Sequence, residues 1–151
     1  MSYKLKTFWD DVEKVSKTII VDTFNNKKYE GVAKCAPDDY PYAKEYVGET
    51  ISQTRAKIEM LKDIRDNEIK PQIKILNHLY TNMSTSTNFN PKSYEAKMLH
   101  RQLQIKRADL NAVNDLIESM KQYIKDYLDN YMYARKTLEK KAKNRQEDKV
   151  D

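Results

Sequence analysis

Histidine, cysteine and paired acids are the side chains in this sequence whose chemistry could support catalysis or metal binding. The two histidines are His78 and His100, and neither has a glutamate three residues before it. The glutamate and histidine pattern that holds metal ions in helical bundles is therefore missing. A metal site would need further ligands that the sequence does not identify, so we read both histidines as solvated side chains.

The other reactive groups lack the neighbours that would activate them. Cys35 is the only cysteine, which excludes an intrachain disulfide and a thiolate metal cluster built from this chain alone. The acidic pairs at residues 10–11 and 38–39 have no apolar surroundings that would raise the pKa of a carboxyl group. The sequence also has no glycine-rich phosphate loop and no nucleophile motif. We therefore expect a protein that is not an enzyme, with no metal, no cofactor and no small-molecule substrate.

The composition is typical of a helical chain with a thin core. Among 151 residues there are two glycines and four prolines, and 34% of the residues are charged. Only 39% are hydrophobic, which suits a narrow packing seam better than a compact sphere. The net charge of +5 is a mild basic excess spread along the chain, so acidic proteins, anionic lipids and nucleic acid are permitted as partners but not required.

An apolar stripe in the second half of the sequence predicts a long helix packed against another helix. Its members recur every seven residues, with further apolar residues three or four positions after them, which is the pattern of a coiled-coil seam. We assign the centre of this stripe as the seam within a helical hairpin: Leu103, Leu110, Val113, Ile117, Met120 and Ile124. The pattern leaves open whether the seam closes within one chain or between two chains.

Proline, glycine and polar residues predict where these helices end. Asn90 and Pro91 begin a helix that continues to about residue 145 and is about 80 Å long. The helix before it extends from about residue 42 to 80, with a kink or a hinge expected at Pro71. A polar connection over residues 81–90 joins the two helices into an antiparallel hairpin.

The N-terminal segment predicts a shorter helix that docks on the hairpin. Four apolar residues spaced four, three and four apart indicate an amphipathic helix over residues 7–23: Phe8, Val12, Val15 and Ile19. An irregular connection over residues 24–41, which contains glycine and proline, follows this helix. We therefore expect a single all-α domain over residues 1–151. Its main part is an elongated antiparallel helical hairpin over residues 42–146, with long helices at about 42–80 and 91–145.

Aromatic residues that the hairpin would leave uncovered indicate a partner surface. The last helix is longer than its neighbour by more than about 20 Å, and its overhanging end carries too much apolar surface to remain in water. We assign the aromatic residues of this overhang and of the N-terminal helix to a partner interface: Tyr123, Tyr127, Tyr131, Tyr133, Phe8 and Trp9. Because the tyrosines follow a packing seam, they do not predict a platform for stacking nucleic-acid bases.

The end of the last helix resembles the C-terminal helix of the PDSW-type accessory subunit of mitochondrial respiratory complex I. That family has a tyrosine three residues before an Ala-Arg-Lys-x-Leu-x-Lys run, and the matching residues here are Tyr131, Ala134, Arg135, Lys136, Leu138 and Lys140. The family joins its hairpin with cysteines, whereas neither long helix here contains one. If the kinship holds, packing replaces those disulfides.

The resemblance implies a non-catalytic accessory subunit of complex I, the NADH:ubiquinone oxidoreductase. Such a subunit lies on the intermembrane-space side of the mitochondrial inner membrane and binds other subunits through helix faces. The residues themselves predict no transmembrane segment, because no stretch approaches the ~18 consecutive apolar residues that a membrane span needs. The first residues also lack the regions of a secretory signal, so without the resemblance we expect a cytoplasmic protein.

Two other functions fit the same features. A basic helical protein could bind nucleic acid, or an acidic filament such as a microtubule, through its lysine and arginine side chains. A scaffold or coat protein could assemble through the same helix faces. We expect other protein subunits of a large complex as the partners, and we do not expect nucleic acid.

Overall fold

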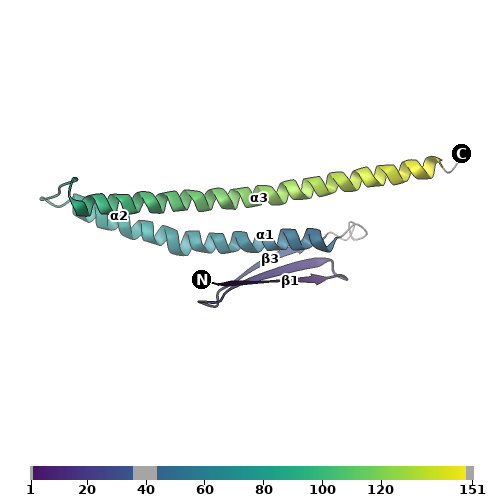
Figure 1. Cartoon of the computed structure of the whole chain (residues 1–151), viewed down its shortest axis with the longest axis horizontal. Helices are drawn as coiled ribbons and strands as arrows, with labels where there is room; N and C mark the ends of the chain where they lie inside the picture. The colour runs from purple at the N-terminus through teal and green to yellow at the C-terminus, as the bar shows by residue number, and fades with distance from the viewer. Residues whose placement is uncertain (1, 36–43, 149–151) are drawn as a thin grey trace. The chain divides into compact units, whose positions relative to one another are not determined.

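The computed structural model describes residues 2–35 and 44–148. Three β-strands come first, β1 (Tyr3–Asp10), β2 (Val15–Asp22) and β3 (Lys28–Lys34), and helices follow (Figure 1). The helical elements are α1 (Glu45–Ile64), the π-helical turn η2 (Arg65–Ile69), α2 (Lys70–Ser84) and α3 (Tyr94–Asp148). The chain is therefore an α+β protein, and the all-α prediction is wrong.

The chain forms two compact units. The first, which we call the sheet unit, comprises Met1–Lys57 with Ser119–Asp151, and the second, the hairpin unit, comprises Ile58–Glu118. Helices α1 and α3 each contribute residues to both units. Both units bury apolar side chains, with Ile51 5% exposed in the sheet unit and Ile117 1% exposed in the hairpin unit.

Strands replace the amphipathic helix predicted over residues 7–23. Strands β1 and β2 pair antiparallel, with Phe8 opposite Lys17 and Lys6 opposite Ile19. The helical spacing was misleading because one of its members, Val12, lies in the turn between the strands and is 83% exposed. The β-branched side chains that dominate β2 pack well on a pleated sheet, and this preference outweighs the apparent helical periodicity.

Two tight turns connect the strands. In the first, the carboxylate of Asp10 accepts two backbone N–H groups at 2.9 and 3.0 Å, and Lys14 adopts a φ of 53°. In the second, the carboxylate of Asp22 accepts a backbone N–H at 2.9 Å and Asn26 adopts a φ of 60°. Such side-chain caps are typical of aspartate in turns. The predicted irregular connection (24–41) therefore contains β3, and its last part lies outside the described residues.

Helix α1 packs closely on one face of the sheet. A Cβ atom at Gly31 would lie 2.1 Å from the main-chain oxygen of Ser52 and 2.4 Å from the main-chain nitrogen of Ala56, so only glycine fits there. The Ser52 hydroxyl forms hydrogen bonds with the hydroxyls of Ser16 (2.9 Å) and Thr18 (2.8 Å). These three side chains are fully buried, and their mutual hydrogen bonds offset the cost of removing hydroxyl groups from water.

The second half of α3 completes the core of the sheet unit. Ala33 of β3 and two residues of α1, Val47 and Ile51, form a buried apolar cluster. Four partly buried residues of α3 pack against this cluster: Ile124, Tyr127, Leu128 and Tyr131. The sheet unit therefore has three layers, with α1 between the sheet and α3.

The hairpin unit joins its two arms within one chain. Figure 1 shows α2 beside the first part of α3, and the guanidinium of Arg107 donates to the side-chain oxygen of Asn77 across them at 2.9 Å. The helices themselves continue into the sheet unit: the helical segment predicted over 42–80 is observed over 45–84, and the one predicted over 91–145 is observed over 94–148. The predicted cap Asn90 lies before the helix, and the hydroxyl of Ser93 instead accepts the N–H of Ala96 at 3.2 Å.

The helix does not end at Pro71. Proline lacks the N–H that would donate to the carbonyl four residues earlier, and it crowds that carbonyl. The π-helical turn η2 immediately precedes it, and the N–H of Lys70 donates to the carbonyl of Arg65. Pro71 then lies in the first turn of α2, where a missing N–H is tolerated.

Candidate functional site

The open face of the sheet, opposite the face that α1 covers, is the candidate site. Because side chains alternate along a strand, every second residue points to this face. The register aligns nine of them in three rows that cross the strands in the order β1, β2, β3: Lys4, Val21 and Lys28; Lys6, Ile19 and Glu30; Phe8, Lys17 and Val32. We call this set of nine residues the open face.

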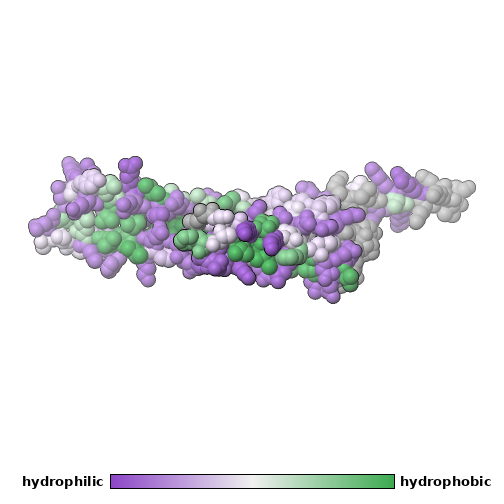
Figure 2. Space-filling view, turned by 60° about the horizontal axis from the view of Figure 1, so that its bottom comes forward, coloured by the Kyte–Doolittle hydropathy of each residue, from purple (hydrophilic) through white to green (hydrophobic). Residues whose placement is uncertain are grey.

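Large apolar side chains remain uncovered on the open face. Phe8 is 54% exposed and Val32 is 42% exposed, while Ile19 and Val21 are partly buried. Phe8, Ile19 and Val21 line a shallow hollow of about 270 Å³ together with Lys4, Lys6 and Lys28. Figure 2 turns this side toward the viewer and shows hydrophobic side chains gathered among hydrophilic ones. The hollow thus has an apolar floor and a basic border.

Positive charge predominates on the open face. Lys17 and Glu30 form an ion pair at 2.5 Å, with both side chains about half exposed. Lys4, Lys6 and Lys28 form no ion pair with any residue in the described part of the chain. Three ammonium groups therefore surround the apolar hollow without a compensating carboxylate from these residues.

Trp9 is separated from Phe8 although both were assigned to one interface. As the next residue along β1, it points away from the open face and toward α1, where a Cβ atom at Gly48 would lie 3.0 Å from its ring. Its indole N–H donates to the carboxylate of Asp11 at 3.4 Å, and the ammonium of Lys14 donates to the same oxygen at 2.9 Å. The hydrogen bond from Lys14, followed by that from Trp9, lowers the pKa of Asp11.

The tyrosines assigned to the partner interface have different environments. Tyr127 and Tyr131 are partly buried against the apolar cluster of the sheet unit, so they pack within the chain. Tyr123 is 50% exposed, and its ring centroid lies 6.0 Å from that of Tyr127. The side chain of Tyr133 lies outside the described residues.

The structure distributes the predicted seam residues between the two units. Leu103 and Ile117 are buried in the hairpin unit, where Leu110 and Val113 are partly buried. The last two members, Met120 and Ile124, are partly buried in the sheet unit.

The residues that carry the family resemblance are described only in part. Lys136 and Lys140 are exposed and Tyr131 is partly buried. The side chains of Ala134, Arg135 and Leu138 lie outside the described residues. The motif therefore offers two exposed lysines on α3 that a partner could contact.

A second cavity, of about 290 Å³, lies within the sheet unit between α1, the end of β3 and α3. Its apolar wall includes Val47, Ile51 and Leu128, and Cys35 lies at its border, half-buried. The cavity gives the lone thiol a location in the fold.

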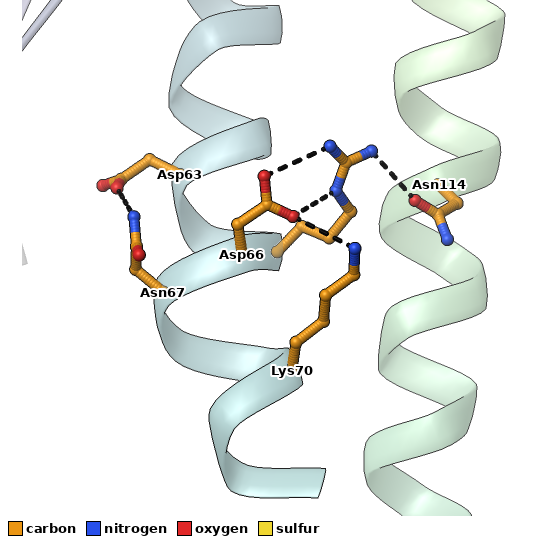
Figure 3. Close-up of polar contacts among 6 residues, drawn as sticks. Asp63, Asp66, Asn67, Lys70 and Asn114 are labelled. Carbon is orange, nitrogen blue, oxygen red and sulfur yellow. Dashed lines mark hydrogen bonds and ion pairs between the residues drawn. The ribbon is translucent and has the colours of Figure 1, made fainter. Parts of the chain in front are cut away.

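Charged side chains of the hairpin unit form a structural network (Figure 3). The carboxylate of Asp66 accepts hydrogen bonds from the Arg65 guanidinium and forms an ion pair with Lys70 at 3.3 Å. Arg65 also donates to Asn114 of α3 at 3.3 Å, which joins the two arms. The hydrogen bond from Arg65 lowers the pKa of Asp66, and the same bond raises the pKa of Arg65.

The two histidines lie on the surface, and the described residues form no metal-binding cluster. His78 is exposed and lies 3.3 Å from the side-chain nitrogen of Asn82, and His100 is exposed beside the ring of Tyr80. No three His, Cys, Asp or Glu side chains within residues 2–35 and 44–148 are placed to hold a metal ion. Within the same residues, no helix is long and apolar enough to cross a membrane.

The sequence reasoning missed the open face as a site. Lys4, Lys6 and Phe8 are spaced two residues apart, which is the period of a β-strand. This spacing could have indicated that the three side chains share one face of a strand. Val21 and Lys28 could be placed beside these residues only once the register was known.

Comparison with protein-family models, with curated proteins and with solved structures gives no match for this chain.

Proposed function

We propose that this protein is a non-catalytic interaction subunit that binds another protein through the open face of its sheet. The observation that carries this proposal is the exposure of Phe8, at 54%, beside Ile19 and Val21 on a sheet whose other face is covered. Apolar patches bordered by polar side chains commonly mark protein interaction sites. Aromatic anchors in such patches commonly contribute much of the binding energy.

The packing beneath the open face supports this proposal. Ser52 ties α1 to β2 through two buried hydrogen bonds, and Gln53 donates to the hydroxyl of Thr7 on β1 at 3.1 Å. The guanidinium of Arg55 donates to the carbonyl of Val32 on β3 at 2.7 Å. Each strand is therefore attached to the same helix, so the backbone that carries the nine side chains is held in place before a partner arrives, which lowers the entropic cost of binding.

Membership of mitochondrial complex I is the finer proposal. It rests on the resemblance of the segment from Tyr131 to Lys140, and its exposed lysines Lys136 and Lys140 are accessible to a neighbouring subunit. The N-terminal sheet is an element that this resemblance does not explain. As an accessory subunit, the protein would bind on the intermembrane-space side of the inner membrane and take no part in electron transfer.

Affinity purification of the tagged chain from its native cells in mild detergent tests both proposals. Phe8→Ser should lose most of the partners that the unmodified chain retains, because it removes the exposed anchor without disturbing a buried contact. Phe24→Ser is the matched control, since Phe24 is 86% exposed in the turn before β3. Partners that bind the Phe8→Ser variant as well as the control would contradict the interaction function. If respiratory subunits are absent from the purified partners, membership of complex I is wrong.

A further inference from the structure

We infer that the partner presents to the open face an apolar protein segment flanked by glutamate or aspartate side chains. The inference rests on the proposed function and adds the chemistry of the partner. It follows from the positions of the lysines around the hollow and from the kind of apolar side chain at its floor.

The lysines form a basic frame around the apolar floor. Lys4 and Lys6 lie two residues apart on β1, so their side chains leave the same face about 7 Å apart along the strand. Lys28 lies on β3 in the same row as Lys4, with Val21 between them, which places it about 10 Å away across the sheet. A segment that covers the floor must therefore pass beside ammonium groups on both sides.

Charge complementarity selects the partner. A neutral or basic segment would take these ammonium groups out of water, or place like charges beside them, without compensation. Glutamate or aspartate beside the apolar contact would instead pair with Lys4, Lys6 and Lys28. Glu30 does not supply this compensation within the chain, because it is paired with Lys17.

The apolar floor favours a protein over nucleic acid. Proteins that bind single strands stack successive bases on aromatic side chains. On the open face only Phe8 is aromatic, while Ile19, Val21 and Val32 are β-branched aliphatic residues without a π face. Such side chains pack well against leucine, isoleucine or methionine of a partner.

A binding experiment with the full-length chain tests the inference. The probe is a fluorescein-labelled helical peptide with a leucine stripe flanked by glutamates, and a second peptide carries glutamine in place of every glutamate. We expect the glutamate peptide to bind at least about tenfold more tightly, and this difference should decrease as salt is added. Labelled oligo(dT) of similar length should bind more weakly than the glutamate peptide.

Matched variants locate the binding on the open face. Lys4→Glu with Lys6→Glu and Lys28→Glu should remove the preference for the glutamate peptide. The control carries the same charge change at three exposed helical lysines, Lys74, Lys97 and Lys125, and should retain the preference. Equal binding of the two peptides, equal effects of the two triple variants, or tighter binding of oligo(dT) would each overturn the inference.

The outcomes also separate this inference from the proposed function. If the peptides bind equally but Phe8→Ser still loses its partners in cells, the chemistry assigned to the partner is wrong and the interaction function stands. If Phe8→Ser keeps its partners in cells, the interaction function itself is wrong, whichever peptide binds.

Discussion

The two faces of the sheet differ in the size of the side chains at their centre. The covered face places Ser16, Thr18 and Gly31 under α1, beside buried apolar residues such as Ile20, whereas the open face combines charged side chains with exposed apolar ones such as Phe8. The difference teaches that closeness of approach, and not hydropathy alone, decides which face a helix covers. Small side chains let α1 approach β3 until backbone meets backbone, and close approach gains dispersion contacts along the whole helix.

The same comparison separates stability from recognition. On the covered face, the buried hydroxyls of Ser16 and Thr18 are hydrogen-bonded to Ser52 and Gly31 lies against the backbone of α1, so substitutions there should change folding. On the open face, the large side chains contact solvent, so substitutions there should change binding while leaving the fold intact. Stability measurements on covered-face variants test the effect on folding, and the purification and peptide experiments test the effect on binding.

Replacement of Gly31 by alanine should have the largest effect. The added Cβ would lie 2.1 Å from a main-chain oxygen of α1, so the helix must move away from the sheet. We expect a loss of at least about 3 kcal/mol in the free energy of unfolding, measured by urea denaturation followed by circular dichroism.

Gly48→Ala provides the matched control for Gly31→Ala. Its Cβ would meet the Cβ of Ser16 at 2.9 Å and the ring of Trp9 at 3.0 Å, a much smaller overlap than the 2.1 Å approach to the backbone at Gly31. Alanine also favours the helix over glycine by about 1 kcal/mol, so Gly48→Ala should cost much less. If the two variants were equally destabilised, the backbone contact between α1 and β3 would not be what limits the approach.

Ser52→Ala should have an intermediate effect. It removes the hydroxyl that joins Ser16 and Thr18, so each of these buried hydroxyls loses one hydrogen bond, and Thr18 keeps its hydrogen bond with Thr7 at 3.1 Å. We expect a loss of about 1 to 3 kcal/mol in the free energy of unfolding. Ser119→Ala, at an exposed position of α3, should change stability by less than about 0.5 kcal/mol. Equal stabilities of the two variants would show that the hydroxyl network does not hold α1 to the sheet.

Asp11→Asn should have the smallest effect, and one that depends on pH. The hydrogen bond from Lys14 lowers the pKa of Asp11 in the folded protein. A carboxyl group with a lowered folded pKa stabilises the fold above its unfolded pKa, and this contribution is lost as the pH falls through the folded value. The unmodified protein should therefore have a slightly higher urea midpoint than Asp11→Asn at neutral pH, and the gap should close as the pH falls below about 4. A gap that stays constant with pH would exclude this carboxylate as its source.

The helical hairpin was predictable because its pattern repeats many times. The seven-residue recurrence through Leu103, Leu110 and Ile117 fixed the type of α3, and the polar connection before it predicted the antiparallel arrangement of the arms. The start of α3 lies three residues after the predicted start because local capping by Ser93 competes with capping by Asn90, and sequence reasoning at this level does not weigh one cap against the other.

The sheet was not predicted because its signals were short and conflicting. Phe8, Val12, Val15 and Ile19 fitted a helix by spacing, and the short range of this pattern gave no second repeat to expose the coincidence. Three of the four residues that β2 places on the covered face are polar, Ser16, Thr18 and Asp22, so in the sequence they resemble polar surface. The partner surface of this face on α1 became identifiable only through contacts between residues 34 and 36 positions apart, such as those from Thr18 and Ser16 to Ser52.

The π-helical turn η2 also determines how the first arm stays in phase with α3. A π turn closes its hydrogen bond over one more residue than an α turn, so η2 accommodates one extra residue in the arm. Before the turn, Ile58 and Leu61 face the core of the hairpin unit. Ile69, the last residue of the turn, and Leu76 of α2 do so again, although the intervals between these residues do not fit one unbroken heptad. The arm behaves as a heptad repeat carrying a single-residue insertion. Length changes of one residue in this segment can thus be absorbed as a change of helix type without turning the apolar stripe away from its partner.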